Sequence, residues 1–120
     1  MTTEVSAGIV SKGKSVLMRF DDKTETWDLP TARSERGELS ADTAERAIKE
    51  LGGECESIRY RNKLKDNFEL DGEDFTVQTF AIELLEEPEE AEWIHVDELE
   101  EKKLAPATKT IKEALIEKIS

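Results

Sequence analysis

Acidic and basic side chains are concentrated in the segment 27–54, which has the residue types that bind cations and phosphate groups. Glu38 precedes a predicted helix, and Arg46 and Glu50 lie four positions apart within it. Residues three or four positions apart share one face of a helix. Carboxylates are hard oxygen ligands for divalent cations, and arginine matches the geometry of phosphate. Residues of these types on one helix face could bind a charged or phosphorylated ligand.

The helix that must position these side chains is predicted at Ser40–Leu51. Ser40 suits the N-cap, and Asp42 in the first turn favours the helix dipole. Gly52 and Gly53 supply a C-terminal stop. Apolar residues recur at helical spacing and form one buried stripe. They are Ala41, Ala44, Ile48 and Leu51.

The remaining pattern predicts strands before and after this helix. Glu4–Val10 and Val16–Phe20 suggest a hairpin, and Phe75–Leu85 is the longest candidate, with a bulge expected near Gln78–Thr79. Other extended segments and the terminal helices are expected at Trp27–Pro30, Cys55–Leu64, near Phe68, at Trp93–Val96, at Asp97–Lys103 and after Pro106. This order lacks regular strand–helix alternation. It predicts an α/β (α+β) fold, an α-β-α sandwich with a mixed β-sheet between helices.

Length, net charge and cysteine content restrict the number of domains, the classes of partner and the compartment that we expect. The 120 residues fit one domain, 1–120. A net charge of −12 repels nucleic-acid backbones and anionic membranes, so we expect no duplex nucleic acid and no membrane as partner. Small anionic ligands are compatible with a local basic patch. The N-terminus shows no secretory signal and Cys55 is the single cysteine, so we expect a cytoplasmic protein.

The segment 27–54 resembles the Nudix box, whose pattern is G-x5-E-x7-R-E-U-x-E-E-x-G-U with U an aliphatic residue. The register is set jointly by Leu29, Pro30, Glu35, Gly37, Glu38, Arg46, Ile48, Glu50 and Gly53. The segments 7–19 and 92–104 also resemble the family, so the likeness covers nearly the whole chain. It implies a Nudix fold and hydrolysis of nucleoside diphosphates linked to another moiety, with Mg²⁺ or Mn²⁺ held by helix glutamates.

The sequence departs from the Nudix pattern where the family places its chemistry. Ala32 replaces the opening glycine, Ala47 and Leu51 replace two glutamates, and Glu54 replaces the final aliphatic residue. Carried over, the resemblance leaves Glu50 as metal ligand, with Glu54 as a substitute candidate. It also leaves a catalytic set of three residues, Glu50, Arg46 and Glu38. Glu38 and Glu50 have a structural alternative, since Arg46 can hold either carboxylate.

Losing these carboxylates is expected to weaken or abolish metal binding. General-base catalysis contributes roughly 10²–10⁴ in rate, and a metal adds several kcal/mol of charge stabilisation. We therefore expect a nucleotide- or phosphate-binding protein with weak or absent hydrolysis. One alternative is a divalent-metal-dependent pyrophosphohydrolase that uses Glu50 with Glu45, Glu54 or an acid from 86–92. Another is a protein-interaction scaffold.

Basic residues outside the helix are candidates for binding the substrate. They are Arg33, Arg36, Arg59, Arg61 and Lys63. The last three alternate along the predicted strand 55–64, which would place them on one face. That face could receive phosphates, or it could be an exposed surface that balances nearby acids. The sequence does not define the substrate or the oligomeric state.

Overall fold

The computed structural model describes residues 2–61 and 63–120. Its larger sheet has β1 at the centre, parallel to β8, while the other pairs are antiparallel. The order is β5-β1-β8-β6, and β7 also pairs with β8. Their bounds are β1 Thr2–Ile9, β5 Thr31–Arg33, β6 Glu54–Arg59, β7 Lys65–Leu70 and β8 Glu73–Glu86. The sheet is therefore mixed, as the sequence predicted.

A second, antiparallel sheet contains β3 with its neighbours β2, β4 and β9. Their bounds are β2 Ser11–Lys12, β3 Ser15–Asp21, β4 Thr26–Asp28 and β9 Glu92–His95. The predicted hairpin of Glu4–Val10 with Val16–Phe20 is wrong for most of its length, because both edges of β1 are occupied by β5 and β8. The chain passes into the second sheet at Val10, whose carbonyl accepts from the amide of Leu17 at 2.9 Å.

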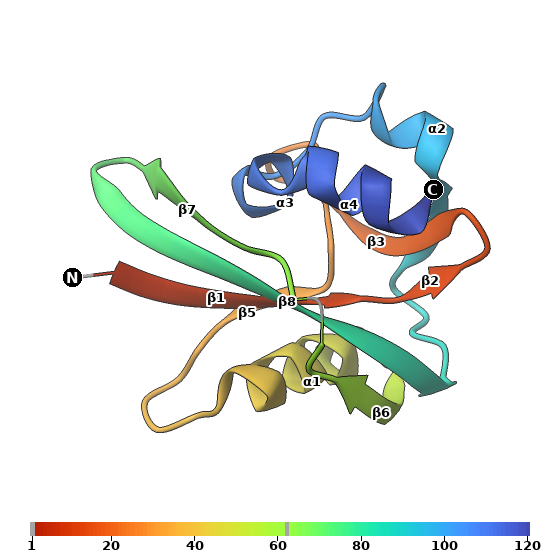
Figure 1. Ribbon diagram of the computed structural model, residues 1–120, viewed down its shortest axis with the longest axis horizontal. Helices are drawn as coiled ribbons and strands as arrows, with labels where there is room; N and C mark the ends of the chain where they lie inside the picture. The colour runs from red at the N-terminus through yellow and green to blue at the C-terminus, as the bar shows by residue number, and fades with distance from the viewer. Residues whose placement is uncertain (1, 62) are drawn as a thin grey trace.

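Helices cover the two faces of the mixed sheet, with α1 below it and α3 and α4 above it in Figure 1. The helices are α1 Ser40–Glu50, α2 Val96–Leu99, α3 Pro106–Thr110 and α4 Lys112–Ile119. This arrangement confirms the predicted α-β-α sandwich, and α1 agrees with the predicted helix. Three details differ: Leu39 is the N-cap of α1, the helix predicted at Asp97–Lys103 is α2 and ends at Leu99, and the last helix is divided at Ile111. Within the described residues, no helix is long and apolar enough to span a bilayer.

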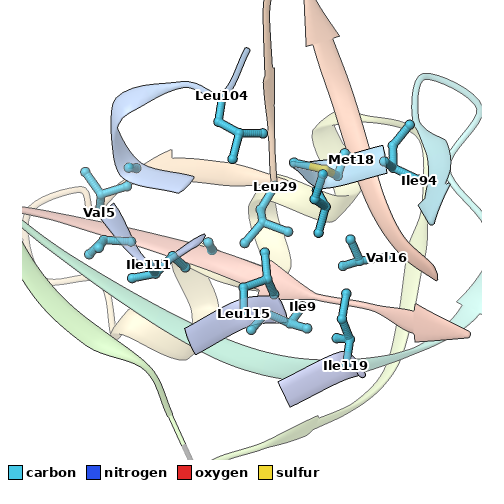
Figure 2. Packing of buried hydrophobic residues seen from close by; sticks show 14 of the residues in the cluster. Val5, Ile9, Val16, Met18, Leu29, Ile94, Leu104, Ile111, Leu115 and Ile119 are labelled. Carbon is cyan, nitrogen blue, oxygen red and sulfur yellow. The ribbon is translucent and has the colours of Figure 1, made fainter. Parts of the chain in front are cut away.

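The core consists of two apolar clusters, one on each side of the mixed sheet. Figure 2 shows the larger cluster, where Leu115 of α4 packs with Met18 of β3 and with Leu29, which directly follows β4. All three side chains are fully buried. The smaller cluster joins Ile48 of α1 to Phe80 of β8. Burial of this size contributes roughly 1.5–3 kcal/mol per large side chain. The smaller cluster therefore fixes α1, and with it the charged face of the helix, against the sheet.

The central strand β8 differs from the sequence prediction near Gln78–Thr79, where no bulge occurs. Its pairing with β1 is uninterrupted through this point. The apparent switch in the apolar pattern arises because both faces of β8 are covered. Phe75 and Val77 belong to the cluster under α3 and α4, whereas Phe80 and Ile82 belong to the cluster under α1.

The predicted strand Cys55–Leu64 is also shorter in the structure. Strand β6 ends at Arg59, and the next strand, β7, begins at Lys65. Asn62, inside the predicted strand, lies outside the described residues. Arg61 and Lys63 therefore belong to a connection, and the regular alternation that placed them on one face with Arg59 does not exist.

Candidate functional site

Arg46 is the centre of the charged cluster on α1. Its Nε and Nη2 atoms donate to the two carboxylate oxygens of Glu38 at 3.0 and 3.1 Å. Its Nη1 atom donates to Glu50 at 2.8 Å, and Nη2 also donates to the carbonyl of Arg33 at 2.7 Å. A planar guanidinium can make these bonds together because its donors form a fixed fork. Arg46 therefore joins α1 to the loop that precedes it.

Glu38 is fully engaged within this loop. Besides Arg46, it accepts from the hydroxyl of Thr43 at 2.7 Å and from the amide of Glu35 at 3.0 Å. The bonds from Arg46, from the Glu35 amide and from Thr43 lower the pKa of Glu38 to about 2. Hydrogen bonds to the ionised form have this effect because they stabilise the charge. The carboxylate thus acts as an anchor for the loop in this arrangement.

A polar cleft of about 250 Å³ opens at the C-terminal half of α1. We call it the box cleft, and its lining residues are Arg19, Thr31, Ala47, Glu50, Leu51 and Glu90. Ala47 and Leu51 are buried at 3% and 9% relative exposure, so their side chains complete the wall with carbon atoms. Glu50 remains exposed at the rim and is bonded to Arg46.

The donor set of the box cleft does not fit the metal centre that the Nudix pattern implies. Of the three helix positions at 47, 50 and 51, only Glu50 offers oxygen ligands. Magnesium requires several oxygen ligands in near-octahedral order. Among the described residues, no group of three His, Cys, Asp or Glu side chains is arranged to hold a metal ion.

The substitute ligand proposed from the sequence, Glu54, lies at the start of β6 opposite Glu86. It is not among the residues that line the box cleft, whereas Glu90 is. The amide of Glu90 donates to the carbonyl of Leu51 at 3.3 Å, so the β8–β9 loop is held against the end of α1. This residue falls in the acidic segment 86–92, which contains too many carboxylates for the sequence to single one out.

An apolar cavity of about 220 Å³ adjoins the box cleft through Thr31, which lines both. We call it the Asp28 cavity, and Phe75, Pro106 and Arg33 are among its walls. The guanidinium of Arg33 lies 5.2 Å from the centroid of the Phe75 ring. Of the five basic residues predicted to bind substrate, Arg33 is the one that lines the Asp28 cavity, and none of the five lines the box cleft.

Asp28 is a buried carboxyl in this cavity that the sequence analysis did not select. It accepts a short hydrogen bond from the hydroxyl of Thr108, and the same hydroxyl accepts from the amide of Leu29 at 3.1 Å. Burial raises the pKa of Asp28, against the opposing effect of the Thr108 bond. The position of Asp28 directly before Leu29–Pro30 is visible in the sequence. Its burial is not, because it depends on Thr108 of α3, 80 residues away.

The other predicted substrate residues lie elsewhere. Arg36 is exposed in the loop before α1. Arg59 and Arg61 line a larger cavity with Tyr60, and the ammonium of Lys63 lies 4.7 Å from the centroid of the Phe80 ring. The five residues therefore do not form one substrate surface among the residues that the structure describes.

Comparison with known proteins gives a clear answer for the fold. No protein-family model matches the sequence, and no curated protein matches it. A Nudix hydrolase from Nitrosomonas europaea superposes with a TM-score of 0.78 at 16% identity, over 98% of this chain and 87% of its own. The mutator MutT protein of Bacillus halodurans gives 0.74 at 22% identity, over 95% and 82%.

The Ap4A hydrolase of C. elegans superposes with a TM-score of 0.65 at 16% identity, over 99% of this chain and 93% of its own. Each superposition covers 95% or more of this chain, so nearly the whole chain has their architecture. At such identities the likeness establishes the fold. It confirms at that level the resemblance that the box residues predicted, and the chain has the Nudix fold.

Proposed function

We propose that this Nudix-fold chain binds a small phosphorylated ligand, with nucleotides as the preferred class, and hydrolyses it weakly or not at all. One observation carries the proposal: buried Ala47 and Leu51 line the box cleft where the Nudix pattern has glutamates. The two acids that remain from the pattern, Glu38 and Glu50, are both bonded to Arg46. The box cleft is present, but two of the three glutamates that the Nudix pattern has on this helix are absent.

Two adjoining hollows support the binding half of this proposal. The box cleft offers the Arg19 guanidinium for an anionic group, and the Asp28 cavity offers Phe75 and Pro106 for a less polar group. Ligand sites combine an apolar wall with a few polar groups in this way. One structural neighbour is named as an Ap4A hydrolase, which is consistent with a nucleotide ligand here.

The first experiment titrates Mn²⁺ and Mg²⁺ into the protein while backbone amide shifts are recorded. We expect no saturable response in the segment 46–54 below about 1 mM metal, because α1 offers a single carboxylate at positions 47, 50 and 51, and that carboxylate is bonded to Arg46. Glu50→Gln is the matched control, since it removes the last acid of the set. A saturable response that this variant abolishes would contradict the proposal.

The second experiment measures release of phosphate or nucleoside monophosphate from a panel of nucleotides with Mn²⁺, alongside amide shifts caused by each ligand. We expect shifts at Thr31, Arg33 and Phe75 with turnover at or near background. Robust release that depends on Glu50 and Glu90 would favour the pyrophosphohydrolase alternative. Neither shifts nor release would leave the interaction scaffold as the function.

A further inference from the structure

A second and larger cavity, of about 710 Å³, lies on the opposite face of the mixed sheet from α1. We call it the Arg61 cavity. Ile9 of β1, Ala81 of β8 and Arg59 of β6 lie side by side across the sheet, because Ala81 pairs with each of the other two. Directly paired residues point to the same face. That face is the α4 side, since Ile9 packs in the cluster with Leu115 of α4.

The cavity exists because the central residue of this row is small. Ala81 lies between Ile9 and Arg59, which leaves a hollow over the sheet. Ile9 is 3% exposed and provides an apolar floor. Lys118 of α4 lines the wall, while Tyr60 and Arg61, which follow β6, line the rim. A volume of this size is within the range of roughly 300–1,000 Å³ that small-molecule sites occupy.

The charge of the Arg61 cavity is opposite to that of the protein. Three of its lining residues, Arg59, Arg61 and Lys118, are cationic, and none is acidic. Glu83, which is not in the lining, pairs with Arg59. Across the described residues, Arg61 forms no ion pair. The chain has a net charge of −12, so this cluster of cations gives the cavity an electrostatic potential opposite in sign to that of the protein as a whole.

Tyr60, which directly follows β6, is also in the lining, but its ring does not face the hollow over Ala81. The ring meets the edge of Phe80 at 5.9 Å between centroids, and Phe80 packs with Ile48 on the α1 side of the sheet. The hollow itself therefore combines the apolar side chains of Ile9 and Ala81 with cationic groups. Such a lining suits a ligand that joins an anionic group to a less polar body, since arginine binds phosphate bidentately.

We propose that the Arg61 cavity is a second ligand site, separate from the box cleft, for an organic phosphate of about nucleotide size. The phosphate binds at Arg61, beside Arg59 and Lys118, and the organic body lies over Ile9 and Ala81. This site does not depend on the state of the metal positions, because α1 contributes no residue to its lining.

The test uses amide-shift titrations of the whole chain with AMP, adenosine and inorganic phosphate. AMP is expected to shift the amides of Ser11, Ile58 and Ala81 with an affinity tighter than about 1 mM, and each fragment is expected to bind roughly tenfold more weakly. Binding of adenosine as tight as that of AMP would contradict the role of the phosphate, and equally tight binding of inorganic phosphate would contradict the role of the organic body. No AMP response in this range overturns the site.

Two variants test the assignment of residues. Arg61→Gln removes an exposed cation and is expected to weaken AMP binding here by roughly tenfold. Ala81→Leu fills the hollow without changing charge and is expected to abolish this binding. Lys23→Gln, in the turn between β3 and β4, is the matched loss of charge and should leave the affinity unchanged. Unchanged affinity in Arg61→Gln overturns the proposal even if Ala81→Leu fails to fold.

The location of the shifts separates this proposal from the proposed function. AMP shifts confined to Thr31, Arg33 and Phe75 would support binding in the Asp28 cavity and the adjoining box cleft, and would overturn the Arg61 cavity. Shifts confined to Ser11, Ile58 and Ala81 would do the reverse. Arg33→Gln should reduce only the first set of shifts.

Discussion

Arg46 donates hydrogen bonds to both carboxylate oxygens of Glu38, at 3.0 and 3.1 Å, although the two residues are eight positions apart in the sequence. The same guanidinium holds Glu50 on α1 and the carbonyl of Arg33 at the end of β5. The charged residues that the chain shares with the Nudix pattern are thus bonded to one another. These bonds fix the loop before α1, and this structural role does not depend on which ligand the box cleft binds.

Arg46→Lys should loosen this loop although it keeps the charge. An ammonium is a compact point charge and cannot reproduce the forked set of bonds to Glu38, Glu50 and the Arg33 carbonyl. We expect the melting temperature to fall by several degrees and the Glu35 amide, which Glu38 holds at 3.0 Å, to exchange roughly tenfold faster. Lys49→Ala is the control, because its 3.9 Å pair with Glu45 is exposed. Unchanged exchange would contradict the anchor role.

Glu38 should titrate well below the other glutamates, with a pKa of about 2. A folded pKa below the ordinary 4.5 means that ionised Glu38 stabilises the fold above pH 4.5 and that this contribution is lost as pH falls toward 2. Carboxyl-carbon chemical shifts measure the pKa directly. Glu38→Gln should show a shallower loss of stability between pH 4.5 and 2 than the parent protein. A pKa near 4.5 would rule out the bonding described above.

Ala47→Glu with Leu51→Glu should convert the wall of the box cleft into a cation site. Without metal, the double variant should be less stable than the parent protein, because two carboxylates replace side chains that are 3% and 9% exposed. Mn²⁺ should then stabilise it by about 2.7 kcal/mol at a concentration one hundred times the Kd. Thermal melts with and without Mn²⁺ provide the measurement. Adding Glu50→Gln to the double variant should remove the gain.

Thr108→Val should destabilise the protein by about 1–3 kcal/mol in urea unfolding. The substitution keeps the shape but removes the donor to buried Asp28 and the acceptor for the Leu29 amide. Thr110→Val, on the same helix, is the control because its hydroxyl bonds only to the Pro106 carbonyl in an exposed position. Similar losses in the two variants would mean that the Asp28 bond contributes little.

Asp28→Asn should stabilise the protein at neutral pH. Burial raises the pKa of Asp28, so the charged form costs stability above that pKa and protonation removes the cost. Asparagine has no charge to bury and keeps an oxygen for Thr108. The advantage over the parent protein should therefore shrink as the pH falls through the raised pKa toward 3.8. An advantage that does not change with pH would mean that it does not come from the charge of Asp28.

The sequence alone determined the features that depend on local spacing. The apolar stripe through Ala44 and Ile48 predicted α1, because helical periodicity is a property of neighbouring residues. The joint spacing of Arg46, Glu50 and the preceding loop residues predicted the Nudix fold. The same positions showed that residues 47 and 51 lack carboxylates, which needs no structure to recognise.

The tertiary structure decided the features that depend on residues far apart in the chain. Occupation of both edges of β1 by β5 and β8 excluded the expected hairpin, and two covered faces of β8 removed the expected bulge. The contact of Asp28 with Thr108 and the row of Ile9, Ala81 and Arg59 join distant segments. Strand pairing and helix docking bring such residues together, and neither leaves a periodic trace in the sequence around them.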